Sequence, residues 1–287
     1  MTYQQQNGNI IVDKLQTEKG GNNLVSINDY PIGNECYPNN ERIYKIKNYD
    51  TDYFAIDFKY ETDLDISILI MCKKYLDDIF NNPKVILVMK YVPYSRMDRN
   101  IEGYMFSLKY FCQLINDLKF HKVLVLDTHS NVTTTLLDRC EEVDIQQYID
   151  EIFDKEKIDY VFYPDNGSME RYSEILKLPN DIIYFYGNKK RNLQTGEIIN
   201  YEIVDCPNIQ NKNILIIDDL CAFGGTFKLA GEKLKEKGAN DILLYVSHCE
   251  NSIYKGELIK SKLLDKIYTT DSILSDWSSN IICNVGD

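Results

Sequence analysis

Short apolar runs rich in β-branched residues alternate along this chain with segments whose apolar residues recur at helical spacing. The clearest runs are Phe54–Phe58, Val85–Lys90, Lys122–Leu126, Tyr160–Tyr163, Ile182–Tyr186, Ile214–Ile217 and Ile242–Ser247. Helical spacing occurs over Leu64–Phe80, Tyr104–Leu118, Met169–Leu176 and Thr226–Lys237. Such alternation is typical of α/β proteins, in which mainly parallel, buried sheets are flanked by helices. The sequence therefore predicts an α/β fold.

The chain length predicts more than one domain. At roughly 150 residues per domain, 287 residues correspond to about two domains. The polar, acidic stretch Asp138–Asp150 has no apolar run that predicts a strand, and similar strand–helix patterns lie on both sides of it. We therefore expect two α/β domains, over residues 1–140 and 141–287.

The charge balance excludes several partners. Asp and Glu number 44 against 32 Lys and Arg, which gives a net charge of −12, and no cluster of five Lys or Arg occurs. Such a chain repels nucleic-acid phosphates.

No apolar run approaches the roughly 18 residues of a membrane-spanning helix, and the N-terminus does not have the features of a signal peptide. The eight cysteines lack zinc-site spacing. We expect a cytoplasmic protein with reduced thiols and neither nucleic acid nor membrane as partner.

The most informative stretch is residues 213–226, where an apolar run is followed by Asp218 and Asp219 and then by Gly224, Gly225 and Thr226. Two acids at the end of a buried strand are costly unless sugar hydroxyls, a cation or backbone donors compensate them. Glycines allow close backbone approach, and the start of the following helix attracts phosphate. The pattern predicts a ligand with a diol and a phosphate. The alternative is an ordinary glycine turn with a threonine helix cap.

This stretch resembles the phosphoribosyl diphosphate (PRPP) signature shared by phosphoribosyltransferases and PRPP synthetases. The resemblance implies that Asp218 and Asp219 hold the ribose hydroxyls. It also implies that the 5-phosphate is bound by the loop Cys221, Ala222, Phe223, Gly224, Gly225 and Thr226. Phe223 stands where the family usually has a hydroxyl residue, which suggests an acceptor whose 5-phosphate is esterified, such as ADP-ribose.

Two segments in the first half favour the synthetases. Tyr91–Arg99 is similar to the motif Pro-Tyr-x-Arg-Gln-Asp-Arg, whose arginines contact ATP, and implies that Arg96, Asp98 and Arg99 bind ATP. Val123–His129 is similar to a strand ending in Asp-Leu-His, which implies that His129 binds ATP and its metal ion. A surface loop with Arg–Asp ion pairs and a structural histidine are the alternative interpretations.

Three further segments carry the same resemblance. Tyr163–Arg171 is similar to Pro-Asp-x-Gly-x-x-x-Arg, which makes Asp165 a candidate metal ligand or ribose-side carboxylate, although ordinary turn chemistry also explains it. Gly187–Asn192 resembles a flexible Lys-x-Arg loop, which implies catalytic roles for Lys189 and Arg191; the alternative is a solvated basic turn. Tyr30–Glu35 more loosely resembles a piece that contributes to a neighbouring subunit's adenine pocket, and implies that Glu35 contacts ATP.

The segments occur in the order found in the ribose-phosphate pyrophosphokinase (PRPP synthetase) family. This resemblance implies two phosphoribosyltransferase-like domains, the first on the ATP side and the second on the ribose-phosphate side. It implies ATP-dependent diphosphoryl transfer to the anomeric hydroxyl of ribose 5-phosphate, with Mg²⁺ as cofactor, PRPP and AMP as products, and a homo-oligomer, a dimer or hexamer. The alternatives are the same chemistry on an esterified acceptor, a phosphoribosyltransferase, and an inactive regulatory homologue of a PRPP synthetase.

Overall fold

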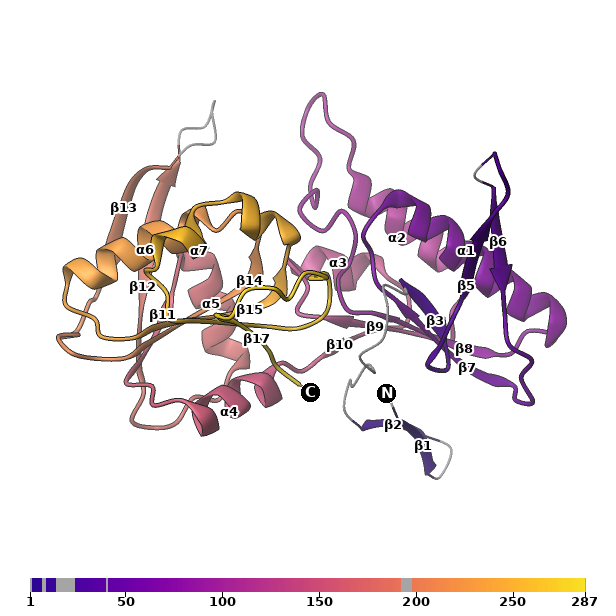
Figure 1. Ribbon diagram of the computed structural model, residues 1–287, viewed down its shortest axis with the longest axis horizontal. Coiled ribbons are helices and arrows are strands. Elements are labelled where there is room, and N and C mark those ends of the chain that lie inside the picture. The colour runs from indigo at the N-terminus through magenta and orange to yellow at the C-terminus, as the bar shows by residue number, and fades with distance from the viewer. Residues whose placement is uncertain (1, 7–8, 14–23, 40, 192–197, 287) are drawn as a thin grey trace. The chain divides into compact units, whose positions relative to one another are not determined.

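The computed structural model describes residues 2–6, 9–13, 24–39, 41–191 and 198–286. The chain divides into two compact units, Met1–Asp144 and Ile145–Asp287, drawn from indigo to yellow along the chain in Figure 1. Each unit contains its own sheet and its own apolar core, and each is described by itself below.

The first unit is built on a six-stranded sheet of order β10-β9-β8-β7-β3-β4. Its strands are β3 (Val25–Ile27), β4 (Tyr30–Pro31), β7 (Tyr53–Phe58), β8 (Lys84–Met89), β9 (Lys122–Leu126) and β10 (Cys140–Val143). The four strands from β7 to β10 are parallel, whereas β3 and β4 pair antiparallel at one edge. Two antiparallel pairs lie outside this sheet: β1 (Thr2–Gln6) with β2 (Asn9–Asp13), and β5 (Gly33–Cys36) with β6 (Arg42–Lys45).

The helices of the first unit are α1 (Asp63–Ile79), α2 (Ser107–Asp117) and α3 (Asn131–Leu136). A capping box starts α1, in which the backbone N–H of Thr62 donates to the carboxylate of Asp65 at 2.6 Å. Leu69 and Leu76 of this helix are fully buried against the strands. The helix forms here because its apolar residues recur at helical spacing, so that they share one face, which is buried against the sheet.

The second unit is built on a seven-stranded sheet of order β13-β12-β11-β14-β15-β16-β17. Its strands are β11 (Tyr160–Tyr163), β12 (Ile183–Arg191), β13 (Ile198–Val204), β14 (Ile214–Cys221), β15 (Ile242–Cys249), β16 (Lys266–Thr269) and β17 (Ile282–Asn284). Every neighbouring pair is parallel except β12 and β13. The helices are α4 (Gln146–Lys155), α5 (Asn166–Ile175), α6 (Gly225–Glu236), the 3₁₀ helix η1 (Asn251–Lys255) and α7 (Leu258–Ser261). Figure 1 shows α6 and α4 on opposite faces of this sheet.

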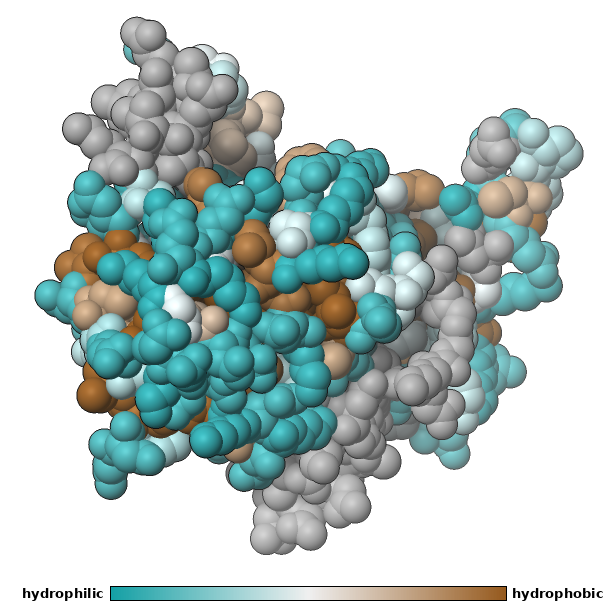
Figure 2. Space-filling model, turned by 60° about the vertical axis from the view of Figure 1, so that its left-hand side comes forward, coloured by the Kyte–Doolittle hydropathy of each residue, from teal (hydrophilic) through white to brown (hydrophobic). Residues whose placement is uncertain are grey.

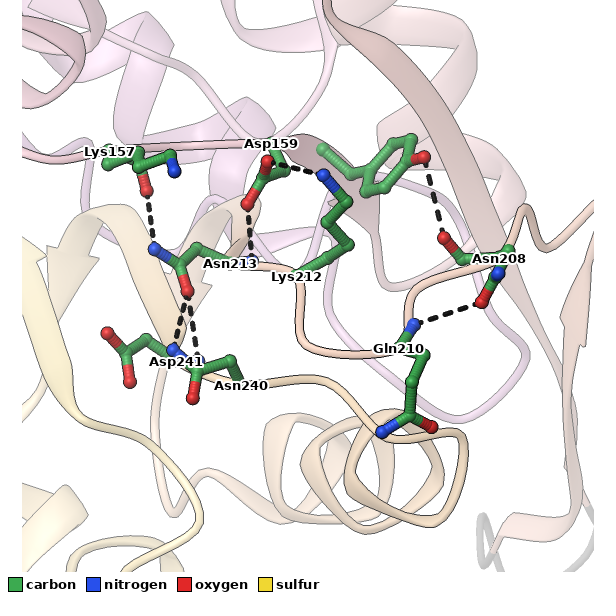
Figure 3. A network of polar contacts seen from close by, with 9 residues as sticks. Lys157, Asp159, Asn208, Gln210, Lys212, Asn213, Asn240 and Asp241 are labelled. Carbon is green, nitrogen blue, oxygen red and sulfur yellow. Dashed lines mark hydrogen bonds and ion pairs between the residues drawn. The ribbon is translucent and has the colours of Figure 1, made fainter.

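A polar network joins the starts of the three central strands of this sheet (Figure 3). Asp159 accepts from the backbone N–H of Asn213 at 2.9 Å and from Lys212 Nζ at 3.0 Å. The amide of Asn213 donates to the carbonyl of Lys157 and accepts from Asn240, both at 2.9 Å. The hydrogen bond from Asn213 and the charge of Lys212 lower the pKa of Asp159 despite its partial burial. The network aligns β11, β14 and β15 at their amino ends.

The surface of the second unit includes a few large apolar side chains among many polar ones. The face drawn in Figure 2 is mostly hydrophilic, with hydrophobic residues in small groups. Among the described residues of this unit, the exposed large apolar ones are Ile175, Ile183, Tyr184, Phe223 and Trp277. Among the described residues, no helix has the length and apolar character needed to cross a membrane.

The structure confirms the predicted α/β fold, and each predicted strand and helix corresponds to an observed one. The expectation that Asp138–Asp150 contains no strand was wrong, because this stretch contains β10 and the first half of α4, although the two units do divide within it, between Asp144 and Ile145. As the edge strand of its sheet, β10 leaves Glu141 and Glu142 exposed and needs no apolar run. The predicted loop at Gly187 was also wrong up to Arg191, because these residues continue β12 and pair with β13.

Candidate functional site

Two adjacent carboxylates lie near the carboxyl end of β14, the central strand of the second unit. Asp218 and Asp219 are both half-buried, and the backbone N–H of Asp219 donates to Asp218 Oδ1 at 3.1 Å. Burial raises the pKa of Asp218 well above its ordinary value, and the charges of Asp219 and Asp165 raise it further, while Lys189 acts in the opposite direction. A carboxyl group in this state is stabilised by a ligand that supplies hydrogen bonds or positive charge.

The loop after these acids turns directly into α6. Gly224 has a φ of +79°, and a Cβ at this position would lie 2.6 Å from Leu258 Cδ2, so both the backbone and the packing require glycine here. Gly225 is exposed and faces open space, and Thr226 lies in the first helical turn. The N–H groups of a first helical turn have no partners within the helix, so this loop is suited to an anion.

Neighbouring segments hold the backbone of this loop in place. The N–H of Glu250 donates to the carbonyl of Cys221 at 2.8 Å. A Cβ on Gly256 would lie 2.0 Å from the carbonyl oxygen of Phe223, which shows how closely the two chains approach. The Phe223 side chain is nevertheless 58% exposed, whereas Cys221 is buried and Ala222 half-buried. The structure therefore fixes the loop backbone while presenting an aromatic ring to solvent.

Asp165 caps α5 at the end of β11, the strand beside β14. Its Oδ1 accepts from the N–H of Ser168 at 2.9 Å, and its Oδ2 forms an ion pair with Nζ of Lys189. Burial opposes ionisation of Asp165, but the charge of Lys189 and the hydrogen bonds from Ser168 outweigh it and lower the pKa. The charge of Asp165 in turn raises the pKa of Asp218. The structure thus brings Asp165, Lys189 and Asp218 together at one edge of the sheet.

The predicted ATP-binding residues of the first unit other than Glu35 follow β8 and β9, which are adjacent parallel strands. Asp98 is 8% exposed and accepts from Arg99 Nε at 3.0 Å. Burial alone would raise the pKa of Asp98, but Arg99, Ser130 and His129 lower it. The structure therefore places the Arg96 loop beside the His129 loop, and it leaves Arg96, Arg99 and His129 exposed.

Neither cluster includes Glu35, and the catalytic role of Arg191 and the joint metal site of His129 and Asp165 stay predictions. Glu35 is exposed on β5 and forms an ion pair with Lys45 of β6, in a two-stranded sheet of its own. The side chain of Arg191 lies outside the described part of the structure. His129 and Asp165 belong to different units, so their joint metal site stays a prediction, and the described residues contain no group of three or more His, Cys, Asp or Glu that could hold a metal ion.

One residue beside Asp165 was missed by the sequence interpretation. Tyr201 on β13 is 6% exposed and donates from its hydroxyl to the carbonyl of Pro164 at 3.1 Å. Gly187 on β12 leaves the space into which that hydroxyl projects. The run Ile198–Val204 has the β-branched and aromatic content of a strand, and recognising it would have placed Tyr201 opposite Lys189.

A mainly parallel sheet with paired acids and a glycine turn at the carboxyl end of its central strand defines a class of α/β protein that binds its ligand at this edge. Residues 132–281 match the model of the phosphoribosyl transferase domain family. The chain belongs to this family.

The curated relatives of the chain include ribose-phosphate pyrophosphokinases. The protein of that name from Sulfurisphaera tokodaii is 26% identical over 290 residues, covering 96% of this chain and 97% of its relative. The one from Hyphomonas neptunium is 29% identical over 198 residues, which span 66% of this chain and only 62% of that protein. These relatives support the predicted family and the transferase class of its members.

A solved structure is similar over most of the chain. The phosphoribosylpyrophosphate synthetase from Mycobacterium smegmatis matches with a TM-score of 0.66 and 15% sequence identity, covering 88% of this chain and 85% of that one. At this identity the likeness concerns the fold, and it agrees with the predicted pair of phosphoribosyltransferase-like domains.

Proposed function

We propose that the protein transfers the diphosphoryl group of ATP to the anomeric hydroxyl of ribose 5-phosphate, giving PRPP and AMP. The observation that carries the proposal is the joint placement of Asp218, Asp219 and the Gly224–Thr226 turn at the carboxyl end of β14. The curated relatives named ribose-phosphate pyrophosphokinase support the same reaction.

The β14 edge would hold the ribose 5-phosphate. The oxygens of Asp218 and Asp219 would bind the two ribose hydroxyls. A hydrogen bond donated by such a hydroxyl would offset the burial and the neighbouring negative charges that raise the pKa of Asp218. The N–H groups of the first turn of α6, with the hydroxyl of Thr226, would hold the 5-phosphate. The residues Cys221, Ala222 and Phe223 would carry the loop around it.

Lys189 would stabilise the charge of the transferred group. In the reaction, the C1 oxygen attacks the β-phosphorus, the bond to the α-phosphate oxygen breaks, AMP leaves with the bonding electrons, and the hydroxyl proton passes to solvent. Lys189 is ion-paired with Asp165 in the structure, and a polyphosphate would compete for this ammonium. Alignment and preorganised positive charge would supply most of the rate enhancement. Arg191 is proposed as a second cation at this position.

The exposed arginines after β8 would bind the nucleotide, together with His129 after β9. Guanidinium groups match phosphate oxygens in a two-pronged geometry, so Arg96 and Arg99 would contact ATP, with Asp98 orienting Arg99 through the bond at 3.0 Å. We also propose that Glu35 contacts the adenine of a neighbouring subunit, which requires a homo-oligomer, a dimer or hexamer. Sedimentation of the purified protein tests that assembly.

Two residues could hold Mg²⁺. The pKa of Asp165 is lowered, so its carboxylate is ionised at neutral pH, and His129 is exposed at the end of β9. Mg²⁺ typically keeps several waters and binds through one or two carboxylates together with substrate phosphates. When bound, it would neutralise charge on the polyphosphate oxygens.

The direct test supplies MgATP and ribose 5-phosphate and follows AMP and PRPP by mass spectrometry. We expect both products in equal amounts, and loss of turnover in Asp218→Asn together with Asp219→Asn. A phosphoribosyltransferase would instead consume PRPP without ATP. Binding of MgATP in calorimetry with no AMP release for any acceptor would identify an inactive regulatory homologue.

Phe223 favours a second candidate, the same transfer to an esterified ribose 5-phosphate such as ADP-ribose. The ring is 58% exposed on the phosphate-binding loop, where it could pack against a group attached to the phosphate. Offering both acceptors in competition measures the preference directly. We expect Phe223→Ser to reduce turnover of ADP-ribose relative to that of ribose 5-phosphate. If wild-type protein turns over ribose 5-phosphate alone, this second candidate is wrong.

A further inference from the structure

Tyr201 and Lys189 are opposite partners in the antiparallel ladder between β13 and β12. Side chains of directly opposite residues project from the same face of a sheet. Both therefore leave the hairpin side by side, and both contact the corner between β11 and α5. The hydroxyl of Tyr201 donates to the carbonyl of Pro164 at 3.1 Å, and the ammonium of Lys189 pairs with the carboxylate of Asp165, the next residue along the chain.

The first of these contacts is buried and closely fitted. Tyr201 is 6% exposed, and Pro164 is buried as well. A Cβ on Gly187, two residues before Lys189, would lie 2.4 Å from the Tyr201 hydroxyl oxygen and 2.8 Å from the carbonyl oxygen of Pro164. Only glycine at position 187 lets this hydroxyl reach the carbonyl. The hydrogen bond therefore depends on a space that the chain provides for it.

The hydroxyl of Tyr201 is a neutral donor close to the acidic site. Burial raises its pKa, and the charges of Asp165 and Asp218 raise it further. A neutral phenol can hold the Pro164 carbonyl without competing with Lys189 for the Asp165 carboxylate. The carbonyl of Pro164 belongs to the peptide that leads into Asp165, so the hydrogen bond from Tyr201 restrains the backbone from which the Asp165 carboxylate reaches Lys189.

We propose that Tyr201 is a positioning residue, which fixes the backbone before Asp165 and thereby sets the place of the Lys189 ammonium for the diphosphoryl transfer. The inference rests on the proposed function for its catalytic consequence. The positioning itself concerns the protein without ligands, so it can be measured separately.

The first experiment measures hydrogen exchange of the Ser168 amide by NMR in unliganded protein, because this N–H donates to Asp165 Oδ1 at 2.9 Å. In Tyr201→Phe, the loosened backbone before Asp165 should speed exchange of this amide about 10-fold or more. The matched control is Tyr49→Phe, which removes a tyrosine hydroxyl that donates to the carbonyl of Ile27 at 2.8 Å in the other unit. A Ser168 exchange rate that is the same in both variants would overturn the proposal.

The second experiment measures kcat and KM with MgATP and the acceptor that turns over. Tyr201→Phe and Gly187→Ala should each lower kcat about 10-fold to 100-fold, with KM for the acceptor little changed. In a Lys189→Met background, Tyr201→Phe should cost nothing further, because the group it positions is gone. Fully additive losses would contradict the proposal. If the wild-type protein has no turnover at all, the proposed function fails, and the NMR result still decides the role of Tyr201.

Discussion

The turn at Gly224 offers a sharp test of the local structure, because two independent penalties meet at one residue. In Gly224→Ala the alanine must adopt a φ of +79°. Its Cβ must also displace Leu258, whose Cδ2 and Cβ atoms lie 2.6 and 2.7 Å from the Cβ position. The backbone penalty for a residue forced into the left-handed region is about 1 kcal/mol. Overpacking a buried leucine adds roughly 1–3 kcal/mol. We therefore expect the free energy of unfolding to fall by about 2–4 kcal/mol.

The matched control is Gly225→Ala, one residue further on, where a Cβ meets no atom within 4 Å and φ is not positive. Alanine is a better helix former than glycine, so this variant should be neutral or slightly stabilised. Urea unfolding followed by the fluorescence of Trp277, the single tryptophan of the chain, reports on the unit that contains both glycines. If Gly224→Ala loses no more stability than Gly225→Ala, the argument from φ and from Leu258 is wrong.

Three further outcomes follow from the second and first units. Asp159→Ala should lower the free energy of unfolding at pH 7 by about 1 kcal/mol, since it removes a charge-assisted hydrogen bond from Asn213. Because the pKa of Asp159 is lowered in the folded protein, the difference between variant and wild type should vanish as the pH falls through that pKa. Urea unfolding at several pH values measures this difference. Lys189→Met should lower kcat about 100-fold to 1,000-fold and move the acid limb of the pH–rate profile to higher pH, because only the hydrogen bonds from Ser168 then oppose the rise of the Asp165 pKa on burial; an unchanged limb would show that Lys189 does not set the Asp165 pKa. Leu69→Ala should cost about 2–5 kcal/mol in thermal unfolding, since Leu69 is fully buried in the first unit, whereas the exposed Leu64 offers a near-neutral comparison.

Apolar periodicity was enough to predict the central strands and the main helices, because their burial depends on regular spacing. It did not predict β10, whose pairing with β9 leaves Glu141 and Glu142 exposed. It also ended β14 at Ile217, although the ladder with β15 continues through Asp218 to Cys221. Backbone hydrogen bonds, which carry no side-chain signature, extend the strand beyond its apolar residues.

The candidate site was predictable only where a short motif carries the chemistry. Asp218, Asp219 and the glycine turn lie within one short stretch, residues 218–226, so their spacing alone marked them as candidates. The Tyr201–Pro164 contact joins residues 37 positions apart in the sequence, and it exists only because β13 folds back on β12. The same hairpin turned Gly187–Arg191, predicted as a loop, into a paired strand.

The network at Asp159 and Asn213 fixes the register of β14 at its amino end. Asp218 is five residues further on, roughly 17 Å away at about 3.3 Å per residue, and side chains alternate between the two faces of the sheet. A register shift of one residue at this end would move the Asp218 carboxylate by one position along the sheet and turn it to the opposite face. The orientation of the acids is therefore set at the far end of the strand, by the amides of Asn213 and Asn240 and the carboxylate of Asp159.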